Sequence, residues 1–247
     1  MQLESIRSIV GMAREDYGGA VTILANGPSL PDTLPHIDQE SLVIAVQGVW
    51  KSGVFGDIAI YADTDPWNEM IKFASPAHFS VITLCNKSAC PIEPLQARLS
   101  AASGNYDAFR LIPFNTRYAG MEDWPRPGCE TREYLDTGVF PDMKLRPRGD
   151  ARRGGAPDTI LCKISSVCAA LHVALLAGAD RITLAGVDCG GGQRSFFDSS
   201  PLENKIQKHL DKHAEQLRGF RNDWEPRGVV CRAFSGEEKH GWPRPQS

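Results

Sequence analysis

The stretch that most restricts the fold combines a serine pair, a run of small apolar residues, a glycine and a short strand pattern. Ser165 and Ser166 are N-cap residue types, ten almost entirely small or apolar residues follow, and Gly178 can adopt a left-handed C-terminal cap. Residues 181–186 are typical of a parallel strand that delivers Asp188 to its carboxyl end. The stretch therefore predicts half of a β-α-β unit in which Ser165, Ser166 and Asp188 line one pocket.

Five further apolar runs are short enough for buried strands and are separated by polar turn residues. They cover residues 21–25, 42–46, 57–61, 81–84 and 228–234. Strands that alternate with helical segments predict an α/β fold: a Rossmann-like, open and mostly parallel sheet with helices on both faces. A chain of 247 residues, 42% of them hydrophobic, fits a single domain of this kind.

Two helices are expected in addition to these strands and to the helix that follows Ser165 and Ser166. Apolar residues at near-helical spacing predict an amphipathic first helix over residues 2–14. Ser200 to Glu203 has the pattern of a capping box with proline at the first helical position, so another helix is expected to begin there. Its apolar stripe spans about 80° of the helical wheel. The stripe comprises Leu202, Ile206, Leu210, Leu217 and Phe220.

His209 and His213 fall on the same face as this stripe, where an imidazole needs a partner. They are either hydrogen-bonded core histidines, an i, i+4 metal pair, or bases that face the pocket. No third metal ligand is evident from the sequence, and imidazole titrates close to neutral pH. A catalytic base is therefore the preferred interpretation.

Polar residues end three successive strands, and parallel strands bring such residues to one edge of the sheet. They are Asn26, Gly27, Pro28 and Ser29 after the first strand, Gln47 after the second and Asp63 after the third. The Asn-Gly-Pro-Ser turn is either a tight loop or a cradle for a phosphate or nucleotide. Asp63 and Asp65 have the spacing with which carboxylates hold a divalent metal such as Mg²⁺, but Asp before Pro is also common turn chemistry.

Residues 113–158 form an irregular insertion in which prolines and glycines accumulate and apolar periodicity fades. Because it is too long for a simple connection, the insertion is interpreted as a lid over the pocket or a partly disordered segment. Basic residues gather at its end, namely Lys144, Arg146, Arg148, Arg152 and Arg153. They form either a solvated loop or a clamp on a phosphate or an anionic acceptor.

The composition argues against several classes of protein. A net charge of −3 gives no global field that favours nucleic acid or an anionic membrane as a partner. No apolar run approaches the roughly 20 residues of a membrane helix, and the N-terminal residues include acids, so a cytoplasmic protein is expected. Seven cysteines without a C-x-x-C pair favour reduced, buried thiols over a disulfide framework or a structural zinc site.

The turn at residues 26–29, the serine pair before an alanine-rich helix, and the Gly186-Val-Asp188 strand end occur in an order that resembles a known group of transferases. This group comprises the bacterial CMP-sialic-acid-dependent sialyltransferases, the motility accessory factors that glycosylate flagellin, and the archaeal-type 6-hydroxymethylpterin diphosphokinases. The resemblance covers roughly residues 20–65 and 160–234. It implies a Rossmann-like nucleotide-dependent transferase.

The resemblance also implies roles for individual residues. In the sialyltransferases the corresponding turn contacts the cytidine nucleotide, the end of the second strand maps onto Gln47, and the helix-opening serine maps onto Ser166. Their general base is a histidine before the last strand, which maps onto His209. This chain has Val167 in place of a glycine, and it has Gly190 and Ser195 in place of the tyrosines that hold the donor phosphates. Phosphate binding therefore falls to Arg194 or to the basic residues 144–153, including Arg152 and Arg153.

Three functions remain open at this point. The first is a glycosyltransferase whose donor is a nucleotide-activated sugar, CMP-type favoured, and whose hydroxyl acceptor is a glycan, a protein or a nucleic acid. The second is a Mg²⁺-dependent diphosphokinase that acts on a small alcohol such as a hydroxymethylpterin, with Asp63, Asp65 or Asp188 near the metal. The third is a nucleotide-binding or nucleic-acid-binding protein without catalysis. The oligomeric state is left open, a homo-oligomer included.

Overall fold

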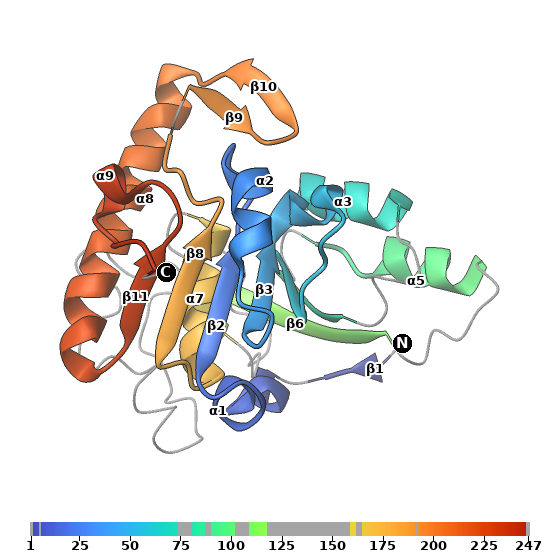
Figure 1. The fold of residues 1–247 in the computed structure, drawn as a ribbon. Helices are drawn as coiled ribbons and strands as arrows, with labels where there is room; N and C mark the ends of the chain where they lie inside the picture. Colours follow the sequence, from blue (N-terminus) through green and yellow to red (C-terminus); the bar gives the residue numbers. More distant parts are fainter. Residues whose placement is uncertain are drawn as a thin grey trace.

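The computed structural model describes residues 2–4, 6–73, 81–86, 90–101, 109–117, 159–161, 165–190 and 192–245. Nine strands of these residues form one sheet in the order β1-β6-β5-β4-β3-β2-β8-β11, with β7 beside β6 (Figure 1). All neighbouring pairs within it are parallel. The strands are β1 (Gln2–Leu3), β2 (Ala20–Leu24), β3 (Leu42–Val46), β4 (Ile58–Tyr61), β5 (Ile82–Asn86), β6 (Arg110–Arg117), β7 (Thr159–Leu161), β8 (Arg181–Ala185) and β11 (Val230–Ala233). The α/β fold expected from the sequence is confirmed.

Helices cover both faces of the sheet, as predicted. They are α1 (Met12–Asp16), α2 (Leu30–Thr33), α3 (Thr64–Phe73), α5 (Glu93–Ala101), α7 (Ser166–Leu176), α8 (Asn204–Trp224) and α9 (Glu237–His240), with 3-10 turns η1 (Ile6–Ile9), η2 (Leu34–His36), η3 (Gln47–Ser52) and η5 (Glu225–Arg227). Residues of η1, α1, α7 and α8 share one apolar cluster with one face of the strands. The opposite face packs on α3 and α5 at one end and on the start of α2 and η3 near β2. Alternation decides the face: Ile23 of β2 belongs to the first cluster, and Leu24 to the cluster with Leu30 of α2.

Helix α7 is the central helix, and all eleven of its residues are buried. Its small side chains let it pack against β2, β3 and β4 at close range. Gly178 ends the segment in the left-handed conformation, with φ of 83° and its amide bonded to the Leu175 carbonyl at 3.0 Å. The predicted glycine cap is therefore present.

Two helix predictions were wrong. Residues 2–14 do not form one amphipathic helix, because Gly11 adopts φ of 81° and separates η1 from α1. No helix begins at Ser200 and Pro201, because Asp198–Pro201 forms strand β10, which pairs antiparallel with β9 (Gln193–Ser195). Helix α8 begins at Asn204 instead. Cross-strand pairing has replaced the local capping pattern in this segment.

Of the expected insertion at 113–158, residues 113–117 belong to β6, and the remainder, including Arg152 and Arg153, lies outside the described residues. The structure therefore leaves the lid interpretation untested. Five cysteines are buried with free thiols, as predicted. They are Cys85, Cys90, Cys168, Cys189 and Cys231.

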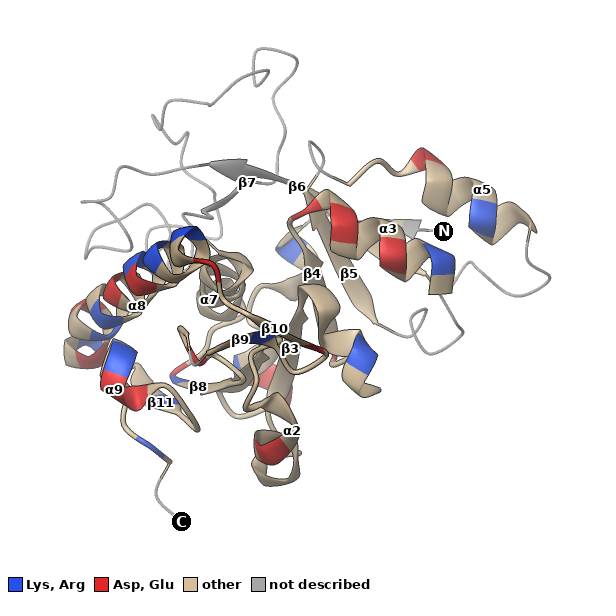
Figure 2. Cartoon of the chain, turned by 90° about the horizontal axis from the view of Figure 1, so that it is seen from above, with Lys and Arg blue, Asp and Glu red and all other residues tan. Residues whose placement is uncertain are grey.

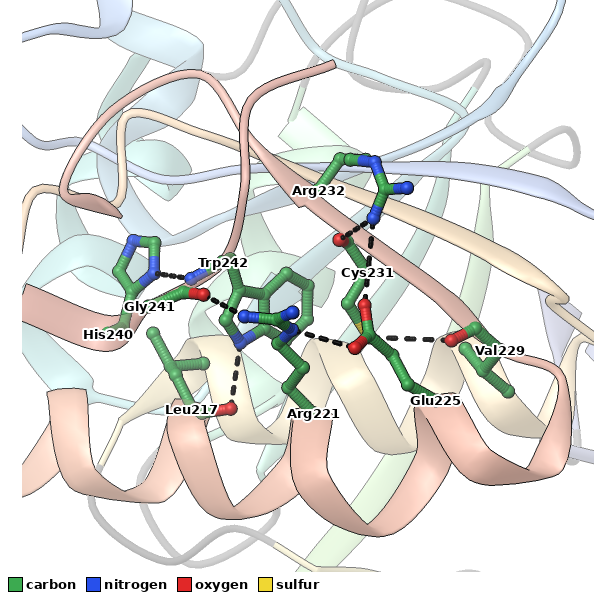
Figure 3. Close-up of polar contacts among 9 residues, drawn as sticks. All are labelled: Leu217, Arg221, Glu225, Val229, Cys231, Arg232, His240, Gly241 and Trp242. Carbon is green, nitrogen blue, oxygen red and sulfur yellow. Dashed lines mark hydrogen bonds and ion pairs between the residues drawn. The ribbon is translucent and has the colours of Figure 1, made fainter. Parts of the chain in front are cut away.

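The C-terminal residues fasten α8 to β11 (Figure 3). Trp242 is fully buried, and its indole Nε1 donates to the Leu217 carbonyl of α8 at 2.7 Å. Arg221 donates to Glu225 at 2.8 Å and also to the Gly241 carbonyl, while Arg232 of β11 lies 3.6 Å from the same Glu225 carboxylate. These contacts fix the position of α8 along the sheet, and with it the histidines nearer the start of that helix.

Candidate functional site

A cavity of about 350 Å³ lies where the carboxyl ends of β2, β3, β4 and β8 meet the start of α7. Strand β2 is flanked by β3 on one side and by β8 on the other, and the chain passes from β2 through β3 to β6 before it returns to β8. Such a reversal of strand order is the place where open α/β sheets bind ligands. The predicted site residues that line the cavity are Asn26, Gly27, Pro28, Gln47, Asp63, Ser165, Ser166, Asp188, Arg194 and His209.

The Asn-Gly-Pro-Ser turn is held by the end of β8. The Gly27 amide donates to the Gly186 carbonyl at 2.8 Å, and the Ser29 amide donates to Asp188 Oδ2 at 3.0 Å. A Cβ at Gly27 would lie 2.3 Å from that carboxylate oxygen, and a Cβ at Gly186, whose φ is 68°, would lie 2.2 Å from the Ala25 carbonyl oxygen. Both glycines are therefore required for close approach of two backbones, and Asp188 fixes the turn.

Ser29 is the one residue of this turn that does not line the cavity. Its hydroxyl donates to Ser235 Oγ at 2.7 Å, and its amide is taken by Asp188. Ser29 thus holds the turn in place together with Asp188. The neighbouring Asn26 accepts the Phe196 amide on its own carbonyl at 3.2 Å, which places the β9–β10 hairpin beside the turn.

Gln47 follows β3 in the left-handed conformation, with φ of 53°, and connects two other site residues. Its Nε2 donates to Asp63 Oδ2 at 2.7 Å and also to Ser166 Oγ. Within the described residues, Gln47 Oε1 is buried and has no hydrogen-bond partner. Gln47 lines the cavity, so an amide oxygen without a partner lies within the wall of the site.

The Asp63 carboxyl faces several groups whose effects on its pKa oppose each other. Burial is the largest effect and raises the pKa, and the nearby Asp65 carboxylate raises it further. The hydrogen bond from Gln47 and the charge of His209 lower it, so the net result is a raised pKa. The charge of His209 therefore acts on the Asp63 carboxyl across the cavity that both line.

The start of α7 faces the cavity without a side-chain cap. Ser165 is the N-cap residue, but its hydroxyl makes no capping bond, and the Cys168 amide bonds to the Ser165 carbonyl at 3.0 Å instead. The amides of Ser166 and Val167 occupy the first two helical positions, which have no acceptor within a helix. Both residues line the cavity, so the positive end of the helix dipole is directed at its contents.

The two histidines of α8 differ in burial, and the prediction that both lie on the buried face was wrong. His213 is 4% exposed, whereas His209 is exposed at the rim of the cavity that both line. His209 lies one turn nearer the start of α8 than His213 and about 40° round the helix from it. Burial lowers the pKa of His213 to about 3, with smaller contributions from His240 and His209.

Charged groups around the cavity are of both signs. Figure 2, viewed onto this side of the molecule, shows Lys and Arg alternating with Asp and Glu along α8. Arg194 lines the cavity from β9 and lies 3.8 Å from Asp198 of β10. Asp65 lines an adjoining cavity rather than the central one. Among the described residues there is no group of three His, Cys, Asp or Glu side chains placed to hold a metal ion.

Sequence reasoning did not find the contacts of His213 and Cys189. The His213 Nε2 lies 2.8 Å from Ser165 Oγ, and its Nδ1 lies 4.0 Å from Cys189 Sγ. The only available signal was the position of His213 on the apolar face of its helix. Its partners come from segments 24 and 48 residues away in the chain, so local patterns could not identify them.

Comparison of this chain with known protein families, curated proteins and solved structures found no match. The resemblance to the sialyltransferase and diphosphokinase group therefore has no support from these comparisons. In the described part of the chain, none of the helices has both the length and the apolar character needed to cross a bilayer.

Proposed function

We propose that this protein is a glycosyltransferase whose donor is a nucleotide-activated sugar, with a CMP-type donor favoured. The observation that carries the proposal is the convergence of the 26–28 turn, Gln47, the uncapped start of α7 and His209 on one cavity at the reversal of strand order. A cavity of about 350 Å³ is at the lower end of the range typical of small-molecule sites. The proposal includes a location in the cytoplasm.

The nucleotide would lie against the strand ends. Asn26 and Gln47 offer polar side chains to the base or the ribose, because they line the cavity at the ends of β2 and β3. The amides of Ser166 and Val167 offer donors to the phosphate, and Arg194 offers a cation at the rim. This arrangement leaves the sugar near His209, on the side from which an acceptor enters.

His209 is the proposed general base. As the acceptor hydroxyl oxygen attacks the anomeric carbon of the donor, His209 takes the hydroxyl proton. The bond between that carbon and the phosphate oxygen breaks, and the nucleotide leaves with the electron pair. The dipole of α7 and Arg194 stabilise the charge that develops on the departing phosphate.

The first experiment is a thermal-shift screen with CMP, UDP, GDP, ATP and their sugar conjugates, because a ligand that binds only the folded state raises its melting temperature. At least one nucleotide should raise it. The donor selected in this way is then incubated with a panel of acceptors, and nucleotide release is measured. His209→Ala should lower the release rate about 10²- to 10⁴-fold while nucleotide affinity stays nearly unchanged. His36→Ala, an exposed histidine outside this cavity, is the matched control.

If no nucleotide is bound, the proposal is refuted. Binding without turnover on any donor would favour the non-catalytic nucleotide-binding protein. Unchanged turnover in His209→Ala would refute only the assignment of His209 as the general base.

A Mg²⁺-dependent diphosphokinase is the second candidate, and the observation that favours it is the Asp63 carboxylate on the cavity wall with Asp65 in the adjoining cavity. Magnesium is commonly held by one or two carboxylates together with substrate phosphates, so Asp63 fits such a role only in part. The metal would neutralise polyphosphate charge. EDTA should abolish activity with ATP in this case, whereas the glycosyltransferase is expected to keep its activity.

A further inference from the structure

A series of polar side-chain contacts crosses the interface between α7 and α8 beside the cavity. His213 of α8 reaches Ser165 at the start of α7, with 2.8 Å between Nε2 and Oγ. A serine at this position ordinarily caps its helix with its side chain, but Ser165 makes no such bond. The His213 contact therefore draws the hydroxyl away from the helix end.

The neighbouring thiols are compatible with one direction of hydrogen donation through these contacts. Cys168 Sγ lies 3.5 Å from Gln216 Oε1, which is an acceptor only, so the thiol donates to that oxygen. Ser165 Oγ lies 3.8 Å from Cys168 Sγ, and a hydroxyl that gives its one hydrogen toward this side accepts on its oxygen from His213 Nε2. The donor of the contact between Ser165 and His213 depends on the tautomer of the ring.

The contact of the other ring nitrogen is compatible with the same tautomer. A neutral imidazole has one donor and one acceptor, so an Nδ1 without hydrogen can accept from the Cys189 thiol, whose Sγ lies 4.0 Å away. Burial, and then the charge of Asp188, raises the pKa of Cys189 to about 12, which keeps its hydrogen on sulfur. Burial likewise keeps His213 neutral, because it lowers the pKa of the ring to about 3. Both groups hold one protonation state over the physiological pH range.

The contact from Ser165 to Cys168 is the weakest link, since an O–H···S contact of 3.8 Å is long and sulfur is a poor acceptor. Ser165 also lines the cavity, next to the amides of Ser166 and Val167. A phosphate oxygen at the helix start would be a far better acceptor for the Ser165 hydrogen. An anionic ligand can therefore replace Cys168 as the acceptor of the Ser165 hydroxyl hydrogen, while the contact between Ser165 and His213 is kept.

We propose that His213 is a positioning residue: by donating Nε2–H to Ser165 Oγ, it commits the serine hydroxyl to donate to a phosphate group of the bound ligand. This inference rests on the proposed nucleotide site. It gives the two histidines of α8 different roles: His209 takes a proton from the acceptor at the rim, whereas His213 keeps its proton and orients the Ser165 hydroxyl. Phosphate binding is thereby supplied by Ser165 from within the cavity.

The test compares a nucleotide with its nucleoside, because only the nucleotide carries the phosphate. CMP, cytidine and inorganic pyrophosphate are titrated by calorimetry into the full chain and into His213→Met, His213→Gln and Ser165→Ala. Methionine keeps most of the buried volume without a donor, whereas glutamine retains an N–H donor at about the position of Nε2. Unliganded melting curves confirm that each variant is folded.

His213→Met should bind CMP about ten- to a hundredfold more weakly, which is the effect of losing one hydrogen bond to a charged group. Its cytidine affinity should be unchanged, and His213→Gln should stay within about threefold of the wild type for both. Ser165→Ala should show the same loss as His213→Met, and the double variant should add little to it, because both act on one donor. A ¹⁵N spectrum of the wild type should show the hydrogen of His213 on Nε2.

Other outcomes are decisive against the inference. If the wild type binds CMP and folded His213→Met binds it equally well, His213 does not act through Ser165, and the proposed function is untouched. If the methionine variant loses cytidine and CMP to the same extent, its role is structural. If the wild type binds neither a nucleotide in the screen nor pyrophosphate, the proposed function fails and this inference fails with it.

Discussion

Mild acid should destabilise this fold through buried histidines, chiefly His172 and His213. His172 of α7 is 1% exposed and His213 of α8 is 4% exposed, and burial lowers the pKa of each ring from 6.5 to about 3. The unfolded chain binds their protons near the ordinary pKa, so it gains protons that the folded chain cannot accept. The stabilising contribution is therefore complete above about pH 6.5 and is lost as the pH falls toward 3.

The magnitude follows from the linkage between protonation and unfolding. At pH 5.5, protonation lowers the free energy of each unfolded histidine by about 1.4 kcal/mol, compared with less than about 0.1 kcal/mol at pH 7.5. Any folded-state pKa below about 4.5 gives nearly the same value, because the folded ring stays uncharged at pH 5.5. The two rings together should lower the free energy of unfolding by about 3 kcal/mol, or the melting temperature by roughly 6–12 °C.

This pH range separates histidines from carboxylates. The lowered pKa of Glu4 removes stability only below its ordinary value of 4.5, and the raised pKa of Asp63 acts in the opposite direction. Urea unfolding of the full chain at pH 7.5, 6.5 and 5.5 measures the change. His213→Gln and His172→Gln should each remove about 1.4 kcal/mol of the pH dependence. The dependence that remains in the double variant includes His240, whose pKa burial also lowers. Equal unfolding free energies at pH 7.5 and 5.5 would refute the argument that these rings are buried uncharged.

Two further substitutions test the packing that supports the site. Gly186→Ala should lower the free energy of unfolding in urea by at least about 2 kcal/mol, because the position combines a left-handed backbone with a backbone clash. Gly228→Ala is the control and should cost about 1 kcal/mol, because Gly228 has a similar φ of 91° but no atom within 4 Å of the added Cβ. Equal costs would contradict the close approach at β8. Trp242→Phe should lower the free energy of unfolding by about 1–2 kcal/mol in the same assay, because it removes the donor to the Leu217 carbonyl but keeps a ring beside Phe220. An unchanged urea midpoint would show that the hydrogen bond from Trp242 to Leu217 does not stabilise the position of α8.

Much of the sheet could be predicted because its strands are buried on both faces. Residues 21–25 and 42–46 are continuous apolar runs, and each is followed by polar residues where the chain leaves the core. The short strands β1 and β7 lack such runs, and their pairing with β6 depends on distant parts of the chain. Local composition identifies strands whose own residues fill the core, but not strands added at an edge.

The two errors on α8 have different physical origins. The capping pattern at Ser200 and Pro201 is a local preference, and pairing of β10 with β9 outweighs it. The helical wheel describes direction around the axis but not depth along it, so it could not separate exposed His209 from buried His213. Strand pairing decides the first outcome, and the position of each histidine along α8 decides the second.

The polar residues of the site divide into a structural set and a set left for a ligand. Asp188 and Ser29 use their polar atoms to hold the 26–29 turn against β8, so neither is expected to discriminate between nucleotides. Gln47 differs, because its amide nitrogen is anchored by Asp63 and Ser166 while its oxygen has no partner among the described residues. An amide held by one end cannot rotate to exchange donor for acceptor. Gln47 therefore holds one orientation at the cavity wall, and a ligand of the proposed kind would meet a fixed amide there.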